Sequence, residues 1–419
     1  MTRLLYFLER KRSRIEWVLL YIMLIPFIRP RGFDEVWDWY TTIFDLWLYG
    51  ALALVFCWVV YDFFQNGLKY KACAYAMAVY YILFVAITLI QQKGINQGLQ
   101  KMFAAPALFM FCMLALKNKP REFLIALVNV LTVIFGLNVT ILCPIITDRL
   151  IGVYHVNFLG HVQVAAQFSL VGCLAAYLLA KMDSRRKKRC ILLVALCLLQ
   201  TLWAKTAAGL LVIAILAGGV ILRSLPRFRP LTVCNPQIFF GGWVAINALM
   251  LLFSFTGLDR MFESLFSFSG RTLIWRETFK LIIQHPILGY GAYGAKIVVP
   301  WSPGMNYAHN EFIQRLLDGG IVLCVAYIVM LYTFVQTVQQ VKNKKVLSII
   351  NICLLAFLVV MLFESVTDYF FIIVFLCMMA YTPEFWNTGE TDGAVNRHES
   401  AELSEGKRPA QKPAGAVAV

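Results

Sequence analysis

Acid–base chemistry is concentrated in the stretch NYAHNEFIQRLLDGG, residues 306–320, which leads into a long apolar segment. His309 is one of five histidines in the chain, and Asn310 beside it is a good N-cap for a helix. Helical spacing puts His309 on one face with Phe312 and Leu316, so we expect its imidazole to point toward other helices rather than into bulk water. The opposite face of that helix carries Glu311, Arg315 and Asp318.

This histidine has two interpretations. A single histidine on an apolar helix face is most often a core residue whose nitrogens are satisfied by neighbours. It can also act as a general base, because imidazole titrates near neutral pH. A metal site is not favoured, because no second histidine or carboxylate stands at a suitable spacing on the same face, and His155 and His161 do not have a known ligand spacing.

A second group of candidate residues lies in SGRTLIWRETFKLIIQHPILGYGAYG, residues 269–294. The spacing predicts a helix with Arg271 and Trp275 on an apolar face and Arg276 on another, ended by Pro286. A guanidinium stays charged and binds phosphate oxygens in a bidentate manner, so Arg271 is a candidate ligand for a diphosphate. The alternative is an interfacial helix whose arginines contact only lipid headgroups.

Lys205 is a third candidate. It is the single charged residue between positions 190 and 222, at an expected turn between two apolar segments. It is either a lysine whose amine extends to the membrane surface or a second cation that faces the same anion as Arg271.

Two further groups of polar residues precede or follow apolar segments. Arg149 and Asn157 precede one such segment, and they are either ordinary loop residues or contacts for a substrate. Glu364 and Asp368 flank the last turn, either as loop carboxylates or as groups that orient an acceptor.

The composition indicates that a membrane scaffold positions these residues. Hydrophobic residues make up 60% of the 419 residues, and the mean hydropathy is +0.71. Apolar segments recur along the chain, many of them near the length of about 20 residues that a helix needs to cross a bilayer. We therefore predict an all-α polytopic membrane protein with about twelve transmembrane helices, at residues 16–29, 43–64, 72–90, 102–116, 124–147, 161–181, 190–204, 207–222, 237–256, 321–340, 347–363 and 368–383.

The net charge of +15 does not point to nucleic acid as a partner. Most lysines and arginines cluster in alternate short loops, such as KMDSRRKKR and KNKK, which is the pattern of membrane topology. The positive-inside rule then places both termini in the cytoplasm, in agreement with an even number of spans. Most of the eleven cysteines lie in apolar segments without a CxxC pair, so we interpret them as small buried hydrophobes.

Two segments are not expected to span the membrane. Residues 257–320 form the one long loop, on the outer side, with apolar residues at helical spacing that predict amphipathic helices. Residues 384–419 are polar and rich in glycine, proline and alanine, so we expect a disordered cytoplasmic tail. The expected organisation is a membrane domain over residues 1–383, followed by that tail.

Four motifs resemble the O-antigen ligase and polymerase superfamily of bacterial surface-polysaccharide assembly. SGRTLIW followed by HPILGYG is similar to the family's loop signature, and HNEFIQRLLDGG resembles its His-Asn motif. AKTAAGLL resembles the turn that supplies another cation, and GVYHVNFLG a segment with an asparagine before a span. This sequence departs from the ligase pattern: Lys205 stands where ligases typically have arginine, Ala204 where serine is usual, and Leu323 where glycine, threonine or tyrosine is preferred.

The resemblance implies glycan transfer from a polyprenyl-diphosphate carrier to an acceptor at the outer face of the bacterial cytoplasmic membrane. His309 would be the general base, and Arg271 and Lys205 would hold the diphosphate. Substrate contacts would come from Arg276, Arg149, Asn157, Asn310 and Trp275. The reaction would invert the anomeric centre without a metal or other cofactor, and a flippase and a chain-length regulator would be partners.

Two sub-functions and one rival remain open. The departures from the ligase pattern favour a polymerase that joins lipid-linked repeat units, with transfer of the finished chain to a lipid A core or another final acceptor as the alternative. The rival is a twelve-span transporter, which would typically have a long central cytoplasmic loop and ionisable residues near mid-membrane. Here the long loop is external and late in the chain, which favours the transferase.

Overall fold

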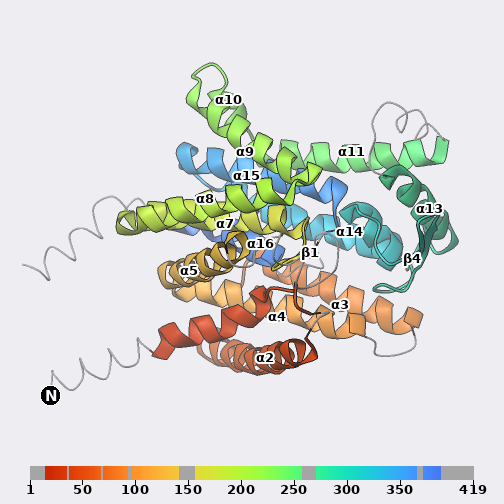
Figure 1. Ribbon diagram of the computed structural model, residues 1–419, viewed down its shortest axis with the longest axis horizontal. Helices are drawn as coiled ribbons and strands as arrows, with labels where there is room; N and C mark the ends of the chain where they lie inside the picture. Colours follow the sequence, from red (N-terminus) through yellow and green to blue (C-terminus); the bar gives the residue numbers. More distant parts are fainter. Residues whose placement is uncertain are drawn as a thin grey trace, which may run out of the picture.

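The computed structural model describes residues 15–34, 37–67, 69–92, 97–140, 156–256, 270–365 and 371–387, and helices dominate it (Figure 1). The long helices are α2 (Asp38–Asn66), α3 (Ala72–Gln92), α4 (Gln97–Asn118), α5 (Pro120–Val139), α7 (Val164–Met182), α8 (Lys187–Ala204), α9 (Ala207–Ser224), α11 (Pro236–Thr256), α14 (Glu311–Gln339), α15 (Lys344–Phe363) and α16 (Phe371–Asn387). Shorter elements are η1 (Ile25–Ile28), η2 (Ser184–Arg186), α10 (Arg229–Thr232) and α13 (Arg271–Gln284). Two antiparallel hairpins pair β1 (Val156–Asn157) with β2 (Gly160–His161) and β3 (Ile297–Val299) with β4 (Ser302–Met305).

The all-α membrane architecture predicted from composition is confirmed. Eight helices in the described part of the chain are long and apolar enough to cross a membrane, and three shorter apolar helices cover Ile15–Ile28, Ala104–Asn118 and Phe371–Pro383. The remaining predicted span corresponds to α8, whose first turn is basic. Each predicted span therefore falls on a helix, although α5 ends at Val139, before the predicted limit, and residues 141–155 lie outside the described residues.

Polar side chains set several helix starts. Thr206 accepts a hydrogen bond from the backbone N–H of Gly209 and caps α9. Asn343 caps α15 in the same way, and Asn310 caps α14, as its position in the sequence predicts. Such caps satisfy backbone N–H groups that the first turn of a helix leaves without partners.

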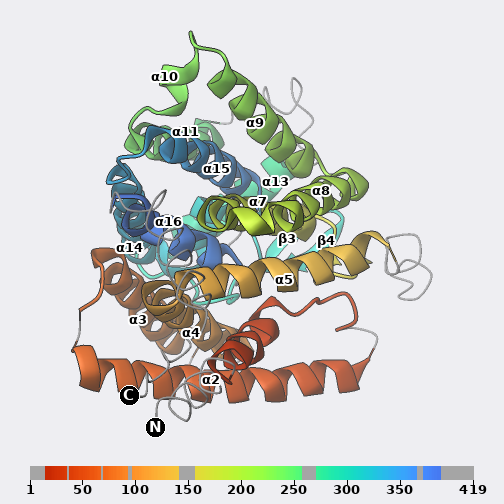
Figure 2. The same ribbon diagram turned by 90° about the vertical axis from the view of Figure 1, so that its left-hand side faces the viewer.

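The helices pack as a bundle with a buried centre and an apolar exterior. In Figure 2, α16 and α7 lie inside the bundle, while α2 runs along one edge and α9 along another. Side chains such as Phe56 and Phe64 of α2 and Leu210 of α9 are exposed. Because these faces are apolar, they suit contact with lipid acyl chains rather than water. Figure 1 shows α13 and β4 together at one end of the bundle.

Helix α14 is broken at Gly319 and Gly320, and the HPILGYG segment fills the break. The φ angle of Gly320 is 59°, in the left-handed region, so the helix ladder is interrupted there. The freed backbone groups pair with the neighbouring loop: Tyr290 donates to Leu317 O at 3.0 Å, Gly291 to Asp318 O at 2.7 Å, and Ile321 to Pro286 O at 2.9 Å. The two glycine-containing motifs therefore hold each other through their backbones.

In the described part of the long loop, residues 270–320, helix α13 is followed by the β3–β4 hairpin and by the first turns of α14. The sequence pattern predicted amphipathic helices in this loop and did not predict the hairpin. At the other end of the chain, α16 continues to Asn387, so the first residues of the expected tail are helical. Residues 388–419 lie outside the described residues, and the tail stays a prediction.

Replacing Gly320 with alanine should lower the stability of the protein markedly. A Cβ at this position would lie 2.3 Å from the backbone carbonyl of Ile287, and the positive φ adds about 1–3 kcal/mol of strain. Gly241→Ala on α11 is the matched control, because no atom lies within 4 Å of the added methyl. Among the detergent-purified variants, only Gly320→Ala should have a much lower melting temperature. Equal melting temperatures for the two variants would contradict the docking of the HPILGYG segment into the break in α14.

Candidate functional site

His309 lies at the mouth of α14 in a tightly fixed backbone. Its φ angle is 51°, which is uncommon for a residue with a side chain, and its side chain is only 14% exposed. The preceding residue is held on both sides: Trp275 Nε1 donates to Ala308 O at 3.0 Å, and Ala308 N donates to Gln314 Oε1 at 2.7 Å. Helices α13 and α14 therefore jointly fix the conformation from which the imidazole projects.

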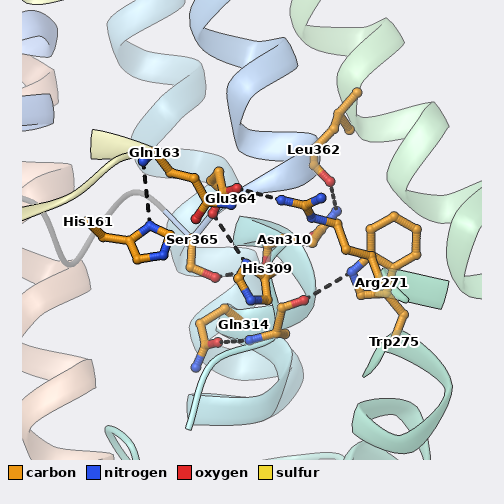
Figure 3. Close-up of polar contacts among 11 residues, drawn as sticks. His161, Gln163, Arg271, Trp275, His309, Asn310, Gln314, Leu362, Glu364 and Ser365 are labelled. Carbon is orange, nitrogen blue, oxygen red and sulfur yellow. Dashed lines mark hydrogen bonds and ion pairs between the residues drawn. The ribbon is translucent and has the colours of Figure 1, made fainter. Parts of the chain in front are cut away.

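Glu364 joins the histidine to the loop arginine (Figure 3). Arg271 donates from Nη2 to Oε1 of Glu364 at 2.7 Å, and His309 Nδ1 lies 3.3 Å from Oε2. The three side chains are 15%, 14% and 8% exposed for Arg271, His309 and Glu364, so water screens these charges weakly. Nδ1 as the donor to Glu364 leaves Nε2 as the nitrogen that can accept a proton.

Tyr307 shares this environment. Its ring packs edge-on against the imidazole of His309, with the centroids 4.5 Å apart. Burial raises the pKa of the Tyr307 hydroxyl, and the charge of Glu364 raises it further, while Arg271 acts in the opposite direction. The hydroxyl therefore stays protonated at neutral pH and does not compete with imidazole for the role of base.

Asn310 ties three helices together. Its Oδ1 accepts from Ile313 N at 2.9 Å, which caps α14, and its Nδ2 donates to Asn247 Oδ1 of α11 and to Leu362 O of α15. The residue is completely buried. Its side-chain atoms are thus engaged inside the protein, where they fix the backbone next to His309, and its predicted substrate contact stays a prediction.

Two other predicted substrate contacts also fall on buried side chains. Trp275 is 7% exposed and uses its indole N–H on Ala308. Asn157 is 1% exposed, and its Oδ1 accepts from Leu159 N at 3.0 Å to close the β1–β2 turn. Spacing along the sequence does not reveal these two internal hydrogen bonds, and the substrate contacts of Trp275 and Asn157 stay predictions.

The remaining predicted residues stay candidates. Arg276 is partly buried on a different face of α13 from Arg271. Arg149 lies outside the described residues. Lys205 is exposed and adopts a left-handed conformation at the turn between α8 and α9.

Lys205 lies at the same end of the bundle as the site. The last turns of α8 pack against the first turns of α7 through Ser169, whose Oγ is 2.8 Å from Thr201 Oγ1. The ring of Phe168, next to Ser169, packs at a tilt against the ring of Phe371 at the start of α16, with the centroids 3.9 Å apart. Glu364 follows the last residue of α15, and α16 is the next helix in the described chain. The C-terminal end of α8 therefore lies on the side of the bundle that holds Glu364. A shared anion for Lys205 and Arg271 stays a prediction.

A cluster of buried charged residues lies on the first turns of α14, next to the site. Arg315 is fully buried, with Nε 3.0 Å from Glu311 Oε1 and Nη1 3.4 Å from Asp318 Oδ2. It also donates to Tyr80 Oη of α3 at 3.1 Å. Periodicity puts this face opposite His309, but it packs against α3 rather than facing away from the protein. Gln314 links the cluster to the site, because it donates to Asp318 and accepts from Ala308.

Glu364 is the residue that sequence reasoning undervalued. The sequence suggested a role in orienting an acceptor, but no pattern connects it with Arg271, which lies 93 residues earlier. The only available signal was a carboxylate at the end of an otherwise apolar predicted span.

The sequence is similar to a known protein family over part of its length. The family model described as O-antigen ligase matches residues 165–328, which include Lys205, Arg271 and His309. The resemblance drawn from the motifs is confirmed. Among individual proteins, a Rickettsia conorii protein provisionally named a polysaccharide ligase is 24% identical over 106 residues. That match covers 22% of this chain and 26% of the relative, so it spans about a quarter of the relative's length.

Over part of its length this multi-pass membrane protein is therefore similar to proteins described as O-antigen or polysaccharide ligases. The geometry provides the parts that such chemistry needs. A buried guanidinium can stabilise an anion, and an imidazole fixed by a carboxylate can accept a proton. Both groups lie at one end of the helical bundle (Figure 1).

Asn310→Ala should destabilise the protein more than Asn343→Ala, although both remove an asparagine N-cap. Loss of a cap costs about 0.5–2 kcal/mol. Asn310→Ala in addition leaves two buried acceptors, Asn247 Oδ1 and Leu362 O, without this donor, at about 1–3 kcal/mol each. Asn343 is exposed and only caps α15. The melting temperatures of the two variants in the same detergent check this order of stability. An equal decrease in melting temperature for both variants would contradict the role of Asn310 in joining three helices.

Proposed function

We propose that this protein transfers a glycan from a polyprenyl-diphosphate carrier to an acceptor at the outer face of the bacterial cytoplasmic membrane. The observation that carries the proposal is the Arg271–Glu364–His309 cluster, within or beside the segment that matches the O-antigen ligase family. This assignment makes the end of the bundle with α13 the outer end, with both termini in the cytoplasm. It treats residues 1–383 as the membrane domain.

In this mechanism His309 acts on the acceptor. Its Nε2 takes the proton of the attacking sugar hydroxyl as the oxygen forms a bond to the anomeric carbon of the donor. The bond from that carbon to the diphosphate oxygen breaks, and the polyprenyl diphosphate leaves with the electron pair. Attack from the face opposite the leaving group inverts the anomeric centre, and the proposal requires no metal.

Arg271 acts on the leaving group. Its Nη2 donates to Glu364, while its Nε is buried and has no hydrogen-bond partner among the described residues. A buried donor of this kind costs about 1–3 kcal/mol unless a ligand satisfies it, so it suits an oxygen of the donor's diphosphate. Lys205 would supply a second cation from the α8–α9 turn, and Arg276 and Arg149 would contact the glycan or phosphate.

Glu364 would serve both ends of the reaction. By accepting from Nδ1 it holds the imidazole with Nε2 toward the substrate, and its charge stabilises the imidazolium that forms. The same carboxylate keeps the Arg271 guanidinium in one orientation before the donor binds. It therefore acts as a positioning residue for both catalytic groups.

Polymerisation of lipid-linked repeat units is our preferred reaction, because the turn lysine and Leu323 depart from the ligase pattern. Ligation of the finished chain to a final acceptor is the second candidate, favoured by the description of the matching family and by the name of the Rickettsia protein. A flippase and a chain-length regulator would work with a polymerase. The glycan product of a deletion strain distinguishes the two: single repeat units on the final acceptor indicate a lost polymerase, and long unattached chains a lost ligase.

His309→Ala and Arg271→Ala should each reduce transfer at least about a hundredfold, as expected for a general base and for a group that stabilises the leaving anion. The measurement is the long-chain glycan ladder on a gel, beside the amount of protein in the membrane. Lys280→Ala is the control, because it lies on α13 with Arg271 but is 62% exposed and paired with Glu277. A normal ladder from either site variant would reject the mechanism.

Glu364→Gln should also lower transfer strongly, because glutamine keeps the shape but removes the charge that holds both cationic partners. The effect should appear in kcat more than in KM, since the carboxylate does not touch the substrate in the proposed mechanism. Kinetics with purified protein and a lipid-linked donor check this split. A variant with unchanged kcat would remove Glu364 from the mechanism.

A further inference from the structure

A second group of basic side chains lines a pocket that the proposed donor contacts do not use. The pocket has a volume of about 110 Å³ and is lined by Arg29, Arg31 and His161. None of the described residues that line it is acidic. A hollow with this lining suits an anion of about the size of a phosphate or diphosphate group.

The pocket is built from segments that are distant in the sequence. Arg31 N donates to Leu159 O at 3.3 Å, and Gly32 N donates to Phe158 O at 3.1 Å. These bonds hold the chain after η1 against the β1–β2 hairpin. Arg29 is fixed in turn, because its guanidinium donates to Asp45 at 2.7 Å and to Asp34 at 3.0 Å. The Arg29 side chain and the backbone of Arg31 are therefore positioned before any ligand binds.

The floor of the pocket is apolar. Phe27, Phe168 and Phe371 line it and are each less than a tenth exposed. Cations over an apolar floor bind an anion more strongly than cations in open water, because the surroundings screen the charge less. An apolar wall also suits the hydrocarbon next to a lipid headgroup.

The pocket and the Arg271–Glu364–His309 cluster share one structural connection. Phe371 starts α16 and lines the pocket, while Glu364 lies at the end of α15, before the same connection. Figure 3 draws His161 and Gln163 in the same close-up as Glu364 and Ser365. One group of basic side chains thus lies at the C-terminal end of α15 and the other at the N-terminal end of α16.

We propose that the pocket of Arg29, Arg31 and His161 binds a phosphate group of the lipid-borne acceptor. The inference rests on the proposed glycan transfer, which needs two substrates held at once. Arg271 takes the donor diphosphate, so a separate phosphate site keeps the acceptor from competing for it. Acceptor binding then brings the sugar hydroxyl toward His309 from the side of the β1–β2 hairpin.

Arg31→Gln combined with His161→Gln tests the pocket, and Arg29 is left unchanged because its ion pairs hold the segment. We expect KM for the acceptor to rise at least about tenfold, the loss typical of hydrogen bonds to a charged group, with kcat at saturating acceptor within about twofold. The matched control is Arg227→Gln with Lys280→Gln, two exposed residues outside this pocket and outside the Arg271–Glu364–His309 cluster. An unchanged acceptor KM in a protein that transfers glycan overturns the proposal.

A binding measurement separates this outcome from failure of the proposed function. Wild type, pocket variant and control are placed in nanodiscs and titrated with polyprenyl monophosphate and, separately, with inorganic diphosphate. Weaker binding of the lipid phosphate by the pocket variant alone supports the proposal even if wild type transfers no glycan. Weakening for inorganic diphosphate as well shows that the pocket recognises the phosphate itself, whereas equal binding of both probes by all three proteins overturns the proposal.

Discussion

The carboxylate of Glu364 is the interaction on which the candidate site depends. It contacts a guanidinium from the long loop and an imidazole from the start of α14, and its own position is set by the end of α15. Without it, two groups able to carry positive charge would face each other in a poorly screened environment and would repel. With it, both keep a fixed orientation. Glu364 thus holds side chains from the long loop and from the start of α14 together at the end of α15. In this arrangement the guanidinium can stabilise an anion and the imidazole can accept a proton.

The backbone around the break in α14 gives that arrangement its rigidity. Gly319 and Gly320 interrupt the helix, and the HPILGYG segment satisfies the freed carbonyl and N–H groups. Unsatisfied backbone groups are costly in a membrane-embedded protein, so this docking constrains both segments. Because α13 ends where the docked segment begins, Arg271 is held relative to His309 by backbone as well as by side chains. The glycines of the two motifs thus serve the same structural feature, which is the docking of the HPILGYG segment into the break in α14.

Buried charge beneath the site adds a second constraint. Arg315 with Glu311 and Asp318 is expensive to bury and is tolerated because the partners neutralise one another and Tyr80 adds a hydrogen bond. Through Gln314 this cluster reaches Ala308, and Trp275 reaches the same residue from α13. The strained backbone of His309 is therefore over-determined by its neighbours, which is the condition under which such strain persists.

Local chemistry determined much of this protein from the sequence alone. Apolar segments of membrane length predicted the helices, Asn310 predicted the cap of α14, Pro286 predicted the end of α13, and the motifs around Arg271 and His309 predicted the family resemblance. These features depend on neighbours a few residues apart. Only the tertiary structure decided that Glu364 joins Arg271 to His309, that Asn157, Asn310 and Trp275 spend their polar groups internally, and that the polar face of α14 is buried. Such pairings join residues far apart in the chain, and periodicity fixes the face of a helix but not the partner that the face meets.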